Sequence, residues 1–332
     1  MKAMVIAKDE GGGTLAWRDV PDPTPGPGEI LLRIRATGLN RADLFQRQGA
    51  YPARAGASGL VIAGLEAAGE VAALGPGVTG LAVGDRVMAM CAGGYAELTT
   101  VHHRVAVAIP SSLSFEEAAS LPVAVTTEHD AIVTNGRLAR GESVLINAAS
   151  SCVGVVAIQI ARLMGAGKVL ATSTSDAKLK ALAPLGVDRG INTQREPLAD
   201  TVLAATEGKG VDVIIDHVGA SQFADNIKSL ALRGRLVSVG RLGGRVTELD
   251  LDYLALRRVS LIGVTFRTRT LEERIAIADR MKADLLPALA DGRLRPVIDR
   301  VFPLTEALEA QRYMTTNAQI GKIVLRGSLL GC

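Results

Sequence analysis

The sequence predicts an α/β protein that combines a parallel, doubly wound sheet with a second, β-rich domain. Residues 142–165 read as a short aliphatic strand, a turn of small residues and an apolar helix. Strand-like runs and helical patterns then alternate as far as residue 264, whereas the first 120 residues hold short strand-like runs separated by Gly and Pro turns. Alternation of this kind is typical of a parallel sheet, and closely spaced short strands are typical of a barrel.

The beginning and the end of the chain are expected to share the β-rich, barrel-like domain. Its strand-like runs are MKAMVIA, GEILLRIRATG, GLEAAGEVAALG and GDRVMAM, with a turn-rich stretch at 21–29. Near the C-terminus, helical patterns at 271–291 and 305–314 alternate with strand-like runs at 297–302 and 321–327. These last two strands are expected to return to the first domain.

The predicted domain boundaries follow from this return. One domain comprises residues 1–121 and 266–332, and the dinucleotide-binding domain, residues 122–265, is inserted into it. The inserted part has a helical pattern from Asp176 to Leu185 and short buried-strand runs, which are VLI (144–146), KVLAT (168–172), VDVIID (211–216), GRLVSVG (234–240) and VSLIGV (259–264).

The turn after the strand at 144–146 is a candidate phosphate site. It leads into a helix N-terminus, where backbone N–H groups and partial positive charge favour a phosphate. The three glycine positions of the dinucleotide fingerprint G-x-G-x-x-G read Ala149, Ser151 and Gly154. Small residues still let a pyrophosphate approach, and Gly154 permits close packing of helix on strand. Any βα turn could share this pattern, but the strand–helix units that follow favour a dinucleotide.

Composition narrows the class of protein. The net charge is +3 and no basic block stands out, so nucleic-acid binding has little electrostatic support. The cysteines Cys91, Cys152 and Cys332 are far apart, which fits a reducing cytosol better than a disulfide framework. The N-terminus lacks the apolar region of a signal peptide, and no apolar run approaches the roughly 18 residues of a membrane span. A cytoplasmic enzyme without a membrane partner is therefore expected.

The order of motifs resembles the medium-chain dehydrogenase/reductase superfamily, in its zinc-independent quinone oxidoreductase branch, which is zeta-crystallin-like. The tail and the segment at 40–52 are most similar to the subgroup that contains the p53-inducible quinone oxidoreductase. The resemblance implies a six-stranded Rossmann sheet and a GroES-like barrel domain. It covers essentially the whole chain and is carried by GLNRADLFQRQGAYP (38–52), GLEAAGEVAALGPGV (64–78), GDRVMAM (84–90), GGYAEL (93–98), LPVAVTT (121–127), AASSCVGVVAIQIARLMGA (148–166), DVIIDHVG (212–219), LRGRLVSVG (232–240) and RPVIDRVFPLTEALEAQRYMTTNAQIGKIVLR (295–326).

The resemblance predicts no metal. Zinc-dependent members of the superfamily place a cysteine where this chain has Asn40 and a histidine where it has Leu65, and neither side chain here suits tetrahedral zinc. Their structural zinc uses a cysteine cluster, whereas residues 84–98 contain only Cys91. Glu66 remains from the metal motif and is expected to be a structural carboxylate.

The histidines suggest no catalytic base. His102 and His103 are adjacent in a strand-like segment, so their side chains are expected to point to opposite faces rather than to form a ligand pair. His217 is expected to be packed or to line the cofactor. No hydrolytic or covalent machinery is visible. Hydride transfer asks less of the protein, because the nicotinamide carries the chemistry.

The end of the second strand favours NADPH over NADH. NAD specificity is usually set by an acidic residue there, but residues 171–175 contain none. Ser173 and Lys178 match positions that bind the 2′-phosphate in NADPH-using quinone oxidoreductases, although an isolated lysine of this kind is also compatible with a solvated helix face. Asp176 is expected to be a helix N-terminal residue rather than a ribose ligand.

The remaining cofactor positions follow from the resemblance. They lie mostly beyond the carboxyl ends of the predicted strands, where dinucleotides bind. Cys152 stands where the family often has glycine and is expected to substitute for a serine, with its backbone N–H facing phosphate. The full set is Thr127, Ser150, Ser151, Cys152, Val153, Gly154, Ser173, Lys178, Val218, Gly219, Gly240, Arg241, Leu242, Phe266 and Asn317.

Asn40 and Tyr51 are the candidate catalytic residues. The resemblance implies that Asn40 points toward the acceptor, where its amide could bind a carbonyl oxygen as negative charge develops on it. A turn-capping role is the alternative. Tyr51 matches a tyrosine that lines the quinone site of the family, and simple packing is the alternative. Phe45 and Arg267 are candidate walls of the substrate pocket.

Other functions stay open. The same cofactor arrangement would serve a 2-enoyl thioester or alkenal reductase using NADPH. Zeta-crystallins of this branch are also lens structural proteins, and some bind RNA, but the weak charge argues against RNA here. By analogy with relatives, the run at 259–264 is the expected edge strand through which a homodimer forms, and a tetramer is the alternative.

Overall fold

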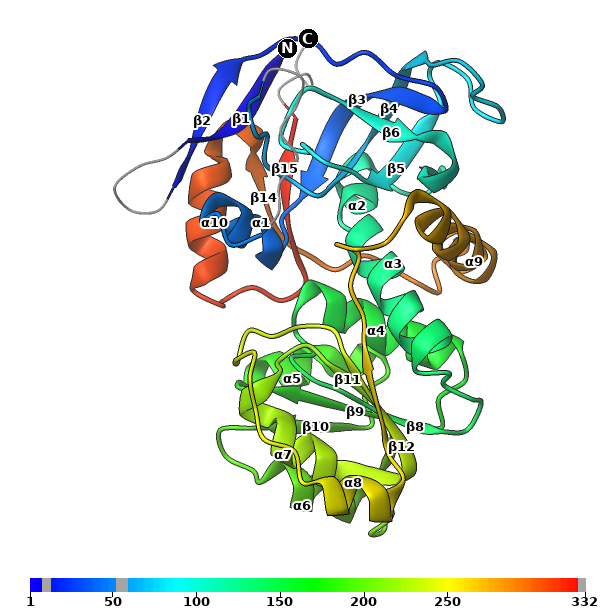
Figure 1. Ribbon diagram of the computed structural model, residues 1–332, viewed down its shortest axis with the longest axis vertical. Coiled ribbons are helices and arrows are strands. Elements are labelled where there is room, and N and C mark those ends of the chain that lie inside the picture. The colour runs from blue at the N-terminus through cyan, green and yellow to red at the C-terminus, as the bar shows by residue number, and fades with distance from the viewer. Residues whose placement is uncertain (8–12, 52–58, 328–332) are drawn as a thin grey trace. The chain divides into compact units, whose positions relative to one another are not determined.

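A computed structural model describes residues 1–7, 13–51 and 59–327 of the chain (Figure 1). Pro52 of the QGAYP segment and Cys332 therefore lie outside the described residues. The chain divides into two compact units, of which the first comprises Met1–Val123 with Thr270–Cys332 and the second comprises Ala124–Arg269. Among the described residues, no helix combines the length and the apolar character that crossing a membrane requires.

The first unit is built on a seven-stranded sheet. Strand β15 pairs antiparallel with β3, which joins the end of the chain to its beginning; in Figure 1 the red β15 runs beside the blue β3. The sheet follows the order β14-β15-β3-β4-β5-β7, with β6 pairing β3. Its strands are β3 (Glu29–Gly38), β4 (Glu66–Leu74), β5 (Arg86–Met90), β6 (Leu98–His102), β7 (Val107–Ala108), β14 (Ile298–Pro303) and β15 (Lys322–Arg326).

A two-stranded sheet and several helices complete this unit. β1 (Lys2–Ala7) pairs antiparallel with β2 (Thr14–Asp19). The helices are α1 (Arg41–Arg47), α2 (Phe115–Ala119), α9 (Leu271–Ala290) and α10 (Ala307–Thr315). The helix and strand patterns expected near the C-terminus are confirmed, with ends shifted by a few residues.

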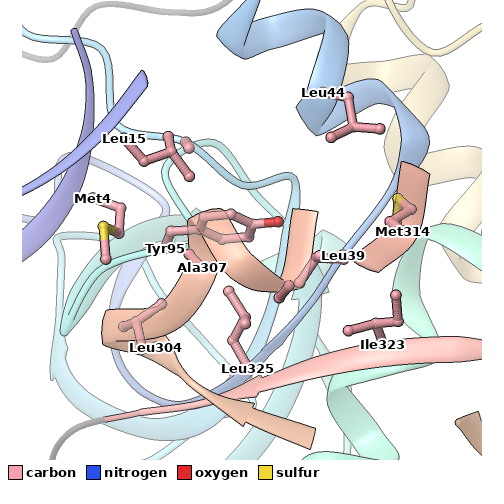
Figure 2. Packing of buried hydrophobic residues seen from close by; sticks show 12 residues of the cluster. Met4, Leu15, Leu39, Leu44, Tyr95, Leu304, Ala307, Met314, Ile323 and Leu325 are labelled. Atoms are coloured by element: carbon pink, nitrogen blue, oxygen red, sulfur yellow. The ribbon is translucent and has the colours of Figure 1, made fainter. Parts of the chain in front are cut away.

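Tyr95 lies at the centre of one apolar cluster of the first unit. Figure 2 shows its ring among aliphatic side chains from both ends of the chain, including Leu39 and Leu325. These core residues are buried, and their burial is the main force that holds the two chain ends in one unit. The labelled members are Met4, Leu15, Leu39, Leu44, Tyr95, Leu304, Ala307, Met314, Ile323 and Leu325.

The second unit contains the predicted doubly wound sheet. Its six strands follow the order β10-β9-β8-β11-β12-β13, and every pairing is parallel. The strands are β8 (Ser143–Ile146), β9 (Lys168–Ser173), β10 (Arg189–Asn192), β11 (Val211–Asp216), β12 (Leu230–Ser238) and β13 (Ser260–Gly263). The predicted Rossmann-type sheet is confirmed. Strand β10 was not among the predicted runs, because it is short and begins with Arg and Gly.

Helices connect these parallel strands. They are α4 (Cys152–Leu163), α5 (Asp176–Leu182), α6 (Leu198–Ala205), α7 (Ala220–Ser229) and α8 (Leu251–Arg257). α3 (Pro122–His129) precedes β8 and continues as a π-helix over Asp130–Asn135. The chain runs outward from β8 to β10 and then returns to β11, directly beside β8. Strand order reverses at this point, and ligands of such sheets bind at the carboxyl ends of the strands there.

Candidate functional site

The turn after β8 is the first candidate feature at the switch point. Its backbone is fixed by the neighbouring strand, since the Ala149 N–H donates to the Thr172 carbonyl at 2.9 Å and the Ala148 N–H donates to Thr172 Oγ1 at 3.0 Å. Ala148 adopts a left-handed φ of 50°. Ser151 is the N-cap of α4, and its Oγ accepts from the Gly154 N–H at 3.1 Å. Ser150 and Ser151 thus lead directly into the helix N-terminus.

Gly154 is required by the close approach of the turn to α4. A Cβ at this position would lie 2.5 Å from Ala149 Cα, so the expected tight packing at this glycine is present. Cys152 and Val153 begin α4, and the backbone of Cys152 does not have a positive φ. A cysteine therefore replaces a family glycine here without backbone strain.

The carboxyl ends of β8 and β11 are linked by a buried histidine. The His217 ring follows β11, with Nδ1 2.7 Å from the Asn147 carbonyl oxygen and Nε2 3.0 Å from Glu128 Oε1. Glu128, on α3, is fully buried, and His217 is 5% exposed. His217 is therefore packed into the end of the sheet, one of the two roles expected for it.

The partners of His217 define where its protons lie. A backbone carbonyl can only accept, so Nδ1 carries a hydrogen and Nε2 must share a proton with Glu128. Burial alone lowers the pKa of His217, but the adjacent Glu128 carboxylate and the Asn147 carbonyl outweigh it and raise that pKa. When His217 is protonated, its imidazolium and the Glu128 carboxylate form a buried ion pair.

Asp176, the acidic residue nearest the end of β9, is already engaged by neighbouring side chains. Its Oδ1 accepts from Asn192 Nδ2 at 2.7 Å, and its Oδ2 lies 2.5 Å from Arg195 Nη1. The hydrogen bonds from Asn192 and Arg195 hold the pKa of Asp176 below its usual range. Ser173 is buried at the end of β9, and Lys178 is half-buried on α5.

The loops after β11 and β12 are bound to each other and bring together further predicted cofactor residues. The Gly243 N–H donates to the Val218 carbonyl at 2.8 Å. A Cβ on Gly240 would lie 2.2 Å from the His217 carbonyl oxygen, so the two loops touch through glycine. Gly219 has φ of 89°, and the side chains of Arg241 and Leu242 are exposed.

The other predicted cofactor and substrate residues are divided between the two units. Thr127, on α3, is half-buried in the second unit, and Phe266 and Arg267 follow β13 there. Asn317 belongs to the first unit, where its Oδ1 accepts from Arg41 Nη2 at 2.5 Å.

Asn40 lies in a buried polar cluster of the first unit. It is the N-cap residue of α1, and its side-chain Nδ2 donates to Glu66 Oε1 at 2.7 Å. Its Oδ1 accepts from Lys322 Nζ at 2.8 Å. Lys322 also forms an ion pair with Glu66, and both side chains are 1% exposed or less. We call Asn40, Glu66 and Lys322 the amide cluster.

Glu66 anchors the amide cluster to its surroundings. Its Oε2 accepts from the Val123 N–H at 2.8 Å, so both carboxylate oxygens have donors. A charge buried in this way requires such partners. Glu66 is placed as the structural carboxylate that the sequence suggested.

A second buried acid adjoins the amide cluster. Asp43 Oδ2 accepts from the Tyr95 hydroxyl at 2.8 Å and from the Asn40 N–H at 2.8 Å. Burial raises the pKa of Asp43 to about 7, although both donors act in the opposite direction. Phe45 is half-buried on α1, and Tyr51 is half-buried in the segment after that helix.

The histidine pair at 102–103 differs from the sequence expectation. The two rings are stacked, with centroids 4.9 Å apart, instead of pointing to opposite faces. The reason is that β6 ends at His102 and the chain enters a 3-10 turn, so strand alternation does not extend to His103. In the described part of the chain, no three or more His, Cys, Asp or Glu side chains are grouped to hold a metal ion.

Sequence reasoning missed Lys322, Glu128 and the pairing of His217. Lysine is almost never fully buried unless paired, so the GKIVLR pattern was interpreted only as a strand. A signal was available for Lys322, which begins an apolar run. Glu128 follows two threonines and precedes a histidine in its helix, so its burial had no such signal.

Two family models match the chain. One, for the alcohol dehydrogenase GroES-like domain, matches residues 26–111. The other, for zinc-binding dehydrogenases, matches residues 152–281.

Relatives extend over nearly the whole chain. The quinone oxidoreductase of Pseudomonas aeruginosa is 33% identical over 330 residues, which are 98% of this chain and 99% of that protein. The chain also matches a part of larger proteins: it spans 14% of a phenolphthiocerol/phthiocerol polyketide synthase of Mycobacterium tuberculosis, with 32% identity over 301 residues.

Solved structures with a similar fold also extend over nearly the whole chain. A mycobacterial protein complexed with NADPH is 30% identical, with a TM-score of 0.88 and coverage of 98% of this chain and 100% of that one. The apo form of the JamJ enoyl reductase is 26% identical, with a TM-score of 0.83 and coverage of 94% and 95%.

The residues of the amide cluster do not fit the zinc that one family name implies. An asparagine amide and the side chain of Leu65 are not zinc ligands, and the ammonium of Lys322 brings a positive charge against the remaining carboxylate. The turn after β8 does fit a dinucleotide, because small residues and a capped helix N-terminus leave its backbone approachable.

Proposed function

Because the chain belongs to the medium-chain dehydrogenase/reductase superfamily, in its quinone oxidoreductase branch, we propose that it is an NADPH-dependent quinone reductase that works without zinc. The observation that carries the proposal is the amide cluster, in which Lys322 and Glu66 bind Asn40 at the position of a family zinc ligand. A quinone or similar electron-poor carbonyl accepts hydride readily without a Lewis acid.

NADPH, when bound, would supply the hydride. The turn from Ser150 to Gly154 would hold its pyrophosphate through backbone N–H groups. Ser173 and Lys178 would bind the 2′-phosphate. Asp176 supports this preference, because its carboxylate is turned to Asn192 and Arg195 and is compensated there.

The remaining predicted positions complete the proposed cofactor site. They are Thr127, which would lie near the nicotinamide, and Val218, Gly219, Gly240, Arg241, Leu242, Phe266 and Asn317.

Asn40 would contact the acceptor through its side-chain nitrogen. One Nδ2 hydrogen is donated to Glu66, and the other makes a long 3.5 Å contact with the Gly38 carbonyl. This second hydrogen is only weakly engaged, so it would be the one that donates to an acceptor oxygen as negative charge develops there. Tyr51 would stack on the ring or donate its hydroxyl, with Phe45 and Arg267 as pocket walls.

The test is NADPH oxidation by chelator-treated protein with an ortho-quinone and with a medium-length enoyl thioester, using NADH as the comparison. Quinone turnover that prefers NADPH and survives chelation is the expected result. Quinone turnover that is lost on chelation and restored by Zn²⁺ would contradict the zinc-free mechanism. Asn40→Ala and Tyr51→Ala should each lower kcat/KM for the acceptor by about tenfold or more while NADPH affinity stays the same.

An enoyl thioester reductase is the second candidate. It is favoured by the similarity in fold to the JamJ enoyl reductase and by the match to a segment of a polyketide synthase. Turnover of the enoyl substrate alone in the same assay would select this candidate and leave the cofactor proposal in place.

We also propose that the protein works as a homodimer in the cytoplasm. β13 is the last strand of its sheet, and Leu261 on it is 40% exposed. Pairing such an edge with a second copy would satisfy its free backbone groups. Among the described residues, Cys91 and Cys152 are not joined to each other by a disulfide. Sedimentation analysis would test the dimer.

A further inference from the structure

Lys322 is a buried lysine directly beside the proposed acceptor-binding residue. It begins β15, and its side chain is 1% exposed. The structure makes specific room for it at the end of β3, because a Cβ on Gly38 would lie 2.3 Å from Lys322 Cε and 2.6 Å from Glu66 Oε1. A buried ammonium is strongly unfavourable unless it is paired and hydrogen-bonded, and Lys322 meets this condition through Glu66 and Asn40.

The two charged partners fix which way the Asn40 amide faces. An ammonium has only donors, and an ionised carboxylate has only acceptors. Lys322 Nζ lies 2.8 Å from Asn40 Oδ1, and Glu66 Oε1 lies 2.7 Å from Nδ2. Flipping the amide would set its N–H groups against the ammonium and its oxygen against the carboxylate. Both contacts would become repulsive, so one orientation is selected.

The selected orientation is the one that stabilises an oxyanion. With Oδ1 held by Lys322, the remaining hydrogen of Nδ2 is the group that Asn40 can offer to an acceptor. In the flipped amide, Oδ1 would face the developing negative charge and repel it. Donation from the ammonium to Oδ1 also draws electron density from the amide, which strengthens its N–H as a donor.

We propose that Lys322 is a positioning residue for hydride transfer: its ammonium holds the Asn40 amide with Nδ2 toward the acceptor oxygen. This inference rests on the proposed function in one respect, that Asn40 contacts the acceptor. Lys322 itself acts through Asn40 and not on the substrate.

The experiment is a double-mutant cycle between Lys322→Met and Asn40→Ala, measured with whichever acceptor the wild type reduces. Methionine keeps an unbranched side chain and removes the ammonium. Lys322→Met alone should lower kcat/KM by about 10- to 100-fold, mainly through kcat, with NADPH affinity unchanged. In the Asn40→Ala background it should have less than about a twofold further effect. Equal losses in both backgrounds, or no loss from Lys322→Met alone, would overturn the inference.

A second variant covers the case that Lys322→Met does not fold, since it leaves the Glu66 carboxylate buried without its cation. Lys322→Met/Glu66→Gln is neutral at this position and should recover most of the thermal stability without recovering activity, because nothing then selects the amide orientation. Recovery of full activity by this variant would refute positioning by charge. Lys282→Met is the matched control, because Lys282 lies in the same unit and its ammonium also donates a hydrogen bond, to the Arg104 carbonyl oxygen at 2.6 Å, at a place away from Asn40.

A readout independent of turnover separates the two proposals. The side-chain NH₂ signals of Asn40 in ¹⁵N-labelled protein can be identified by their loss in Asn40→Ala. Their hydrogens should exchange with solvent at least about tenfold faster in Lys322→Met or its neutral double variant than in the wild type. If the wild type reduces neither acceptor, the proposed function fails, and this exchange measurement alone decides whether Lys322 holds the amide. Unchanged exchange would overturn the inference.

Discussion

Replacing Gly154 by alanine would test the cofactor turn at the point where it is most tightly packed. The added Cβ would lie 2.5 Å from Ala149 Cα and 2.6 Å from the carbonyl carbon and oxygen of the same residue. Carbon atoms in ordinary contact are about 3.5–4.0 Å apart, so the turn and α4 must separate by about 1 Å. Backbone atoms form the whole obstacle, and no side-chain rotation can relieve it.

Two effects of Gly154→Ala can be estimated from this displacement. Overpacking of a tight site costs about 1–3 kcal/mol of folding free energy. A shift of about 1 Å would also weaken the hydrogen bonds that the turn N–H groups make to a phosphate, and a hydrogen bond to a charged group contributes about 1.5–3 kcal/mol. Since about 1.4 kcal/mol corresponds to a factor of ten, NADPH should bind roughly 10- to 100-fold more weakly.

The assay combines calorimetric titration of NADPH with thermal unfolding. Gly263→Ala is the matched control, because it lies in the same unit and a Cβ there would meet nothing within 4 Å. The control should keep NADPH affinity and Tm. If Gly154→Ala binds NADPH within about twofold of the wild type, the turn does not hold the pyrophosphate. If its Tm is also unchanged, the packing estimate itself is wrong.

Three further predictions concern buried or compensated charges. Arg195→Ala should lower the ratio of kcat/KM for NADPH to kcat/KM for NADH by about threefold to tenfold in steady-state assays. Without Arg195 the Asp176 carboxylate loses its compensating charge and would repel a 2′-phosphate. If this ratio does not change, the 2′-phosphate binds elsewhere. His217→Gln should lower the free energy of unfolding in urea by about 3 kcal/mol at pH 6. Because the pKa of His217 is raised in the folded protein, the ion pair stabilises the protein fully below the unfolded pKa of 6.5, and this stabilisation is lost as pH rises through the folded pKa. The difference should therefore shrink as pH rises above 6.5, and a difference that grows with pH would contradict the ion pair. Asp43→Asn should gain stability relative to the wild type as pH rises from 4 to 7, and the gain should then level off. The reason is that burial raises the pKa of Asp43 to about 7, so the wild type loses folding free energy over this pH range and the asparagine variant does not. If the free energies of unfolding in urea of the two proteins change in parallel with pH, Asp43 ionises normally.

The sequence alone predicted the parallel sheet well. Three of the strand runs in the second unit are almost wholly buried, and such runs are determined by local composition; they are VLI at 144–146, KVLAT at 168–172 and VDVIID at 211–216. Strand β10 was not predicted because only its last two residues are buried. The prediction that His102 and His103 point to opposite faces was wrong, because their orientation depends on where strand β6 ends.

In the candidate site, only features that depend on neighbouring residues could be predicted from the sequence. The small-residue turn before α4 could be recognised from its spacing, since its glycine requirement arises within a few residues. By contrast, the left-handed φ falls on Ala148, which no propensity would have selected, and the hydrogen bonds from Ala148 and Ala149 to Thr172 of β9 keep the turn in place.

What the sequence by itself determined is therefore the set of elements, the sheet of the second unit and the family motifs, because hydrophobic period and turn chemistry act over a few neighbouring residues. The tertiary structure decided the charged partners. Lys322 meets Asn40 across 282 residues of chain, and His217 meets Glu128 across 89. A lysine or a glutamate read in sequence is expected at the surface, and only the folded chain supplies the opposite charge and the hydrogen bonds that stabilise these groups when they are buried.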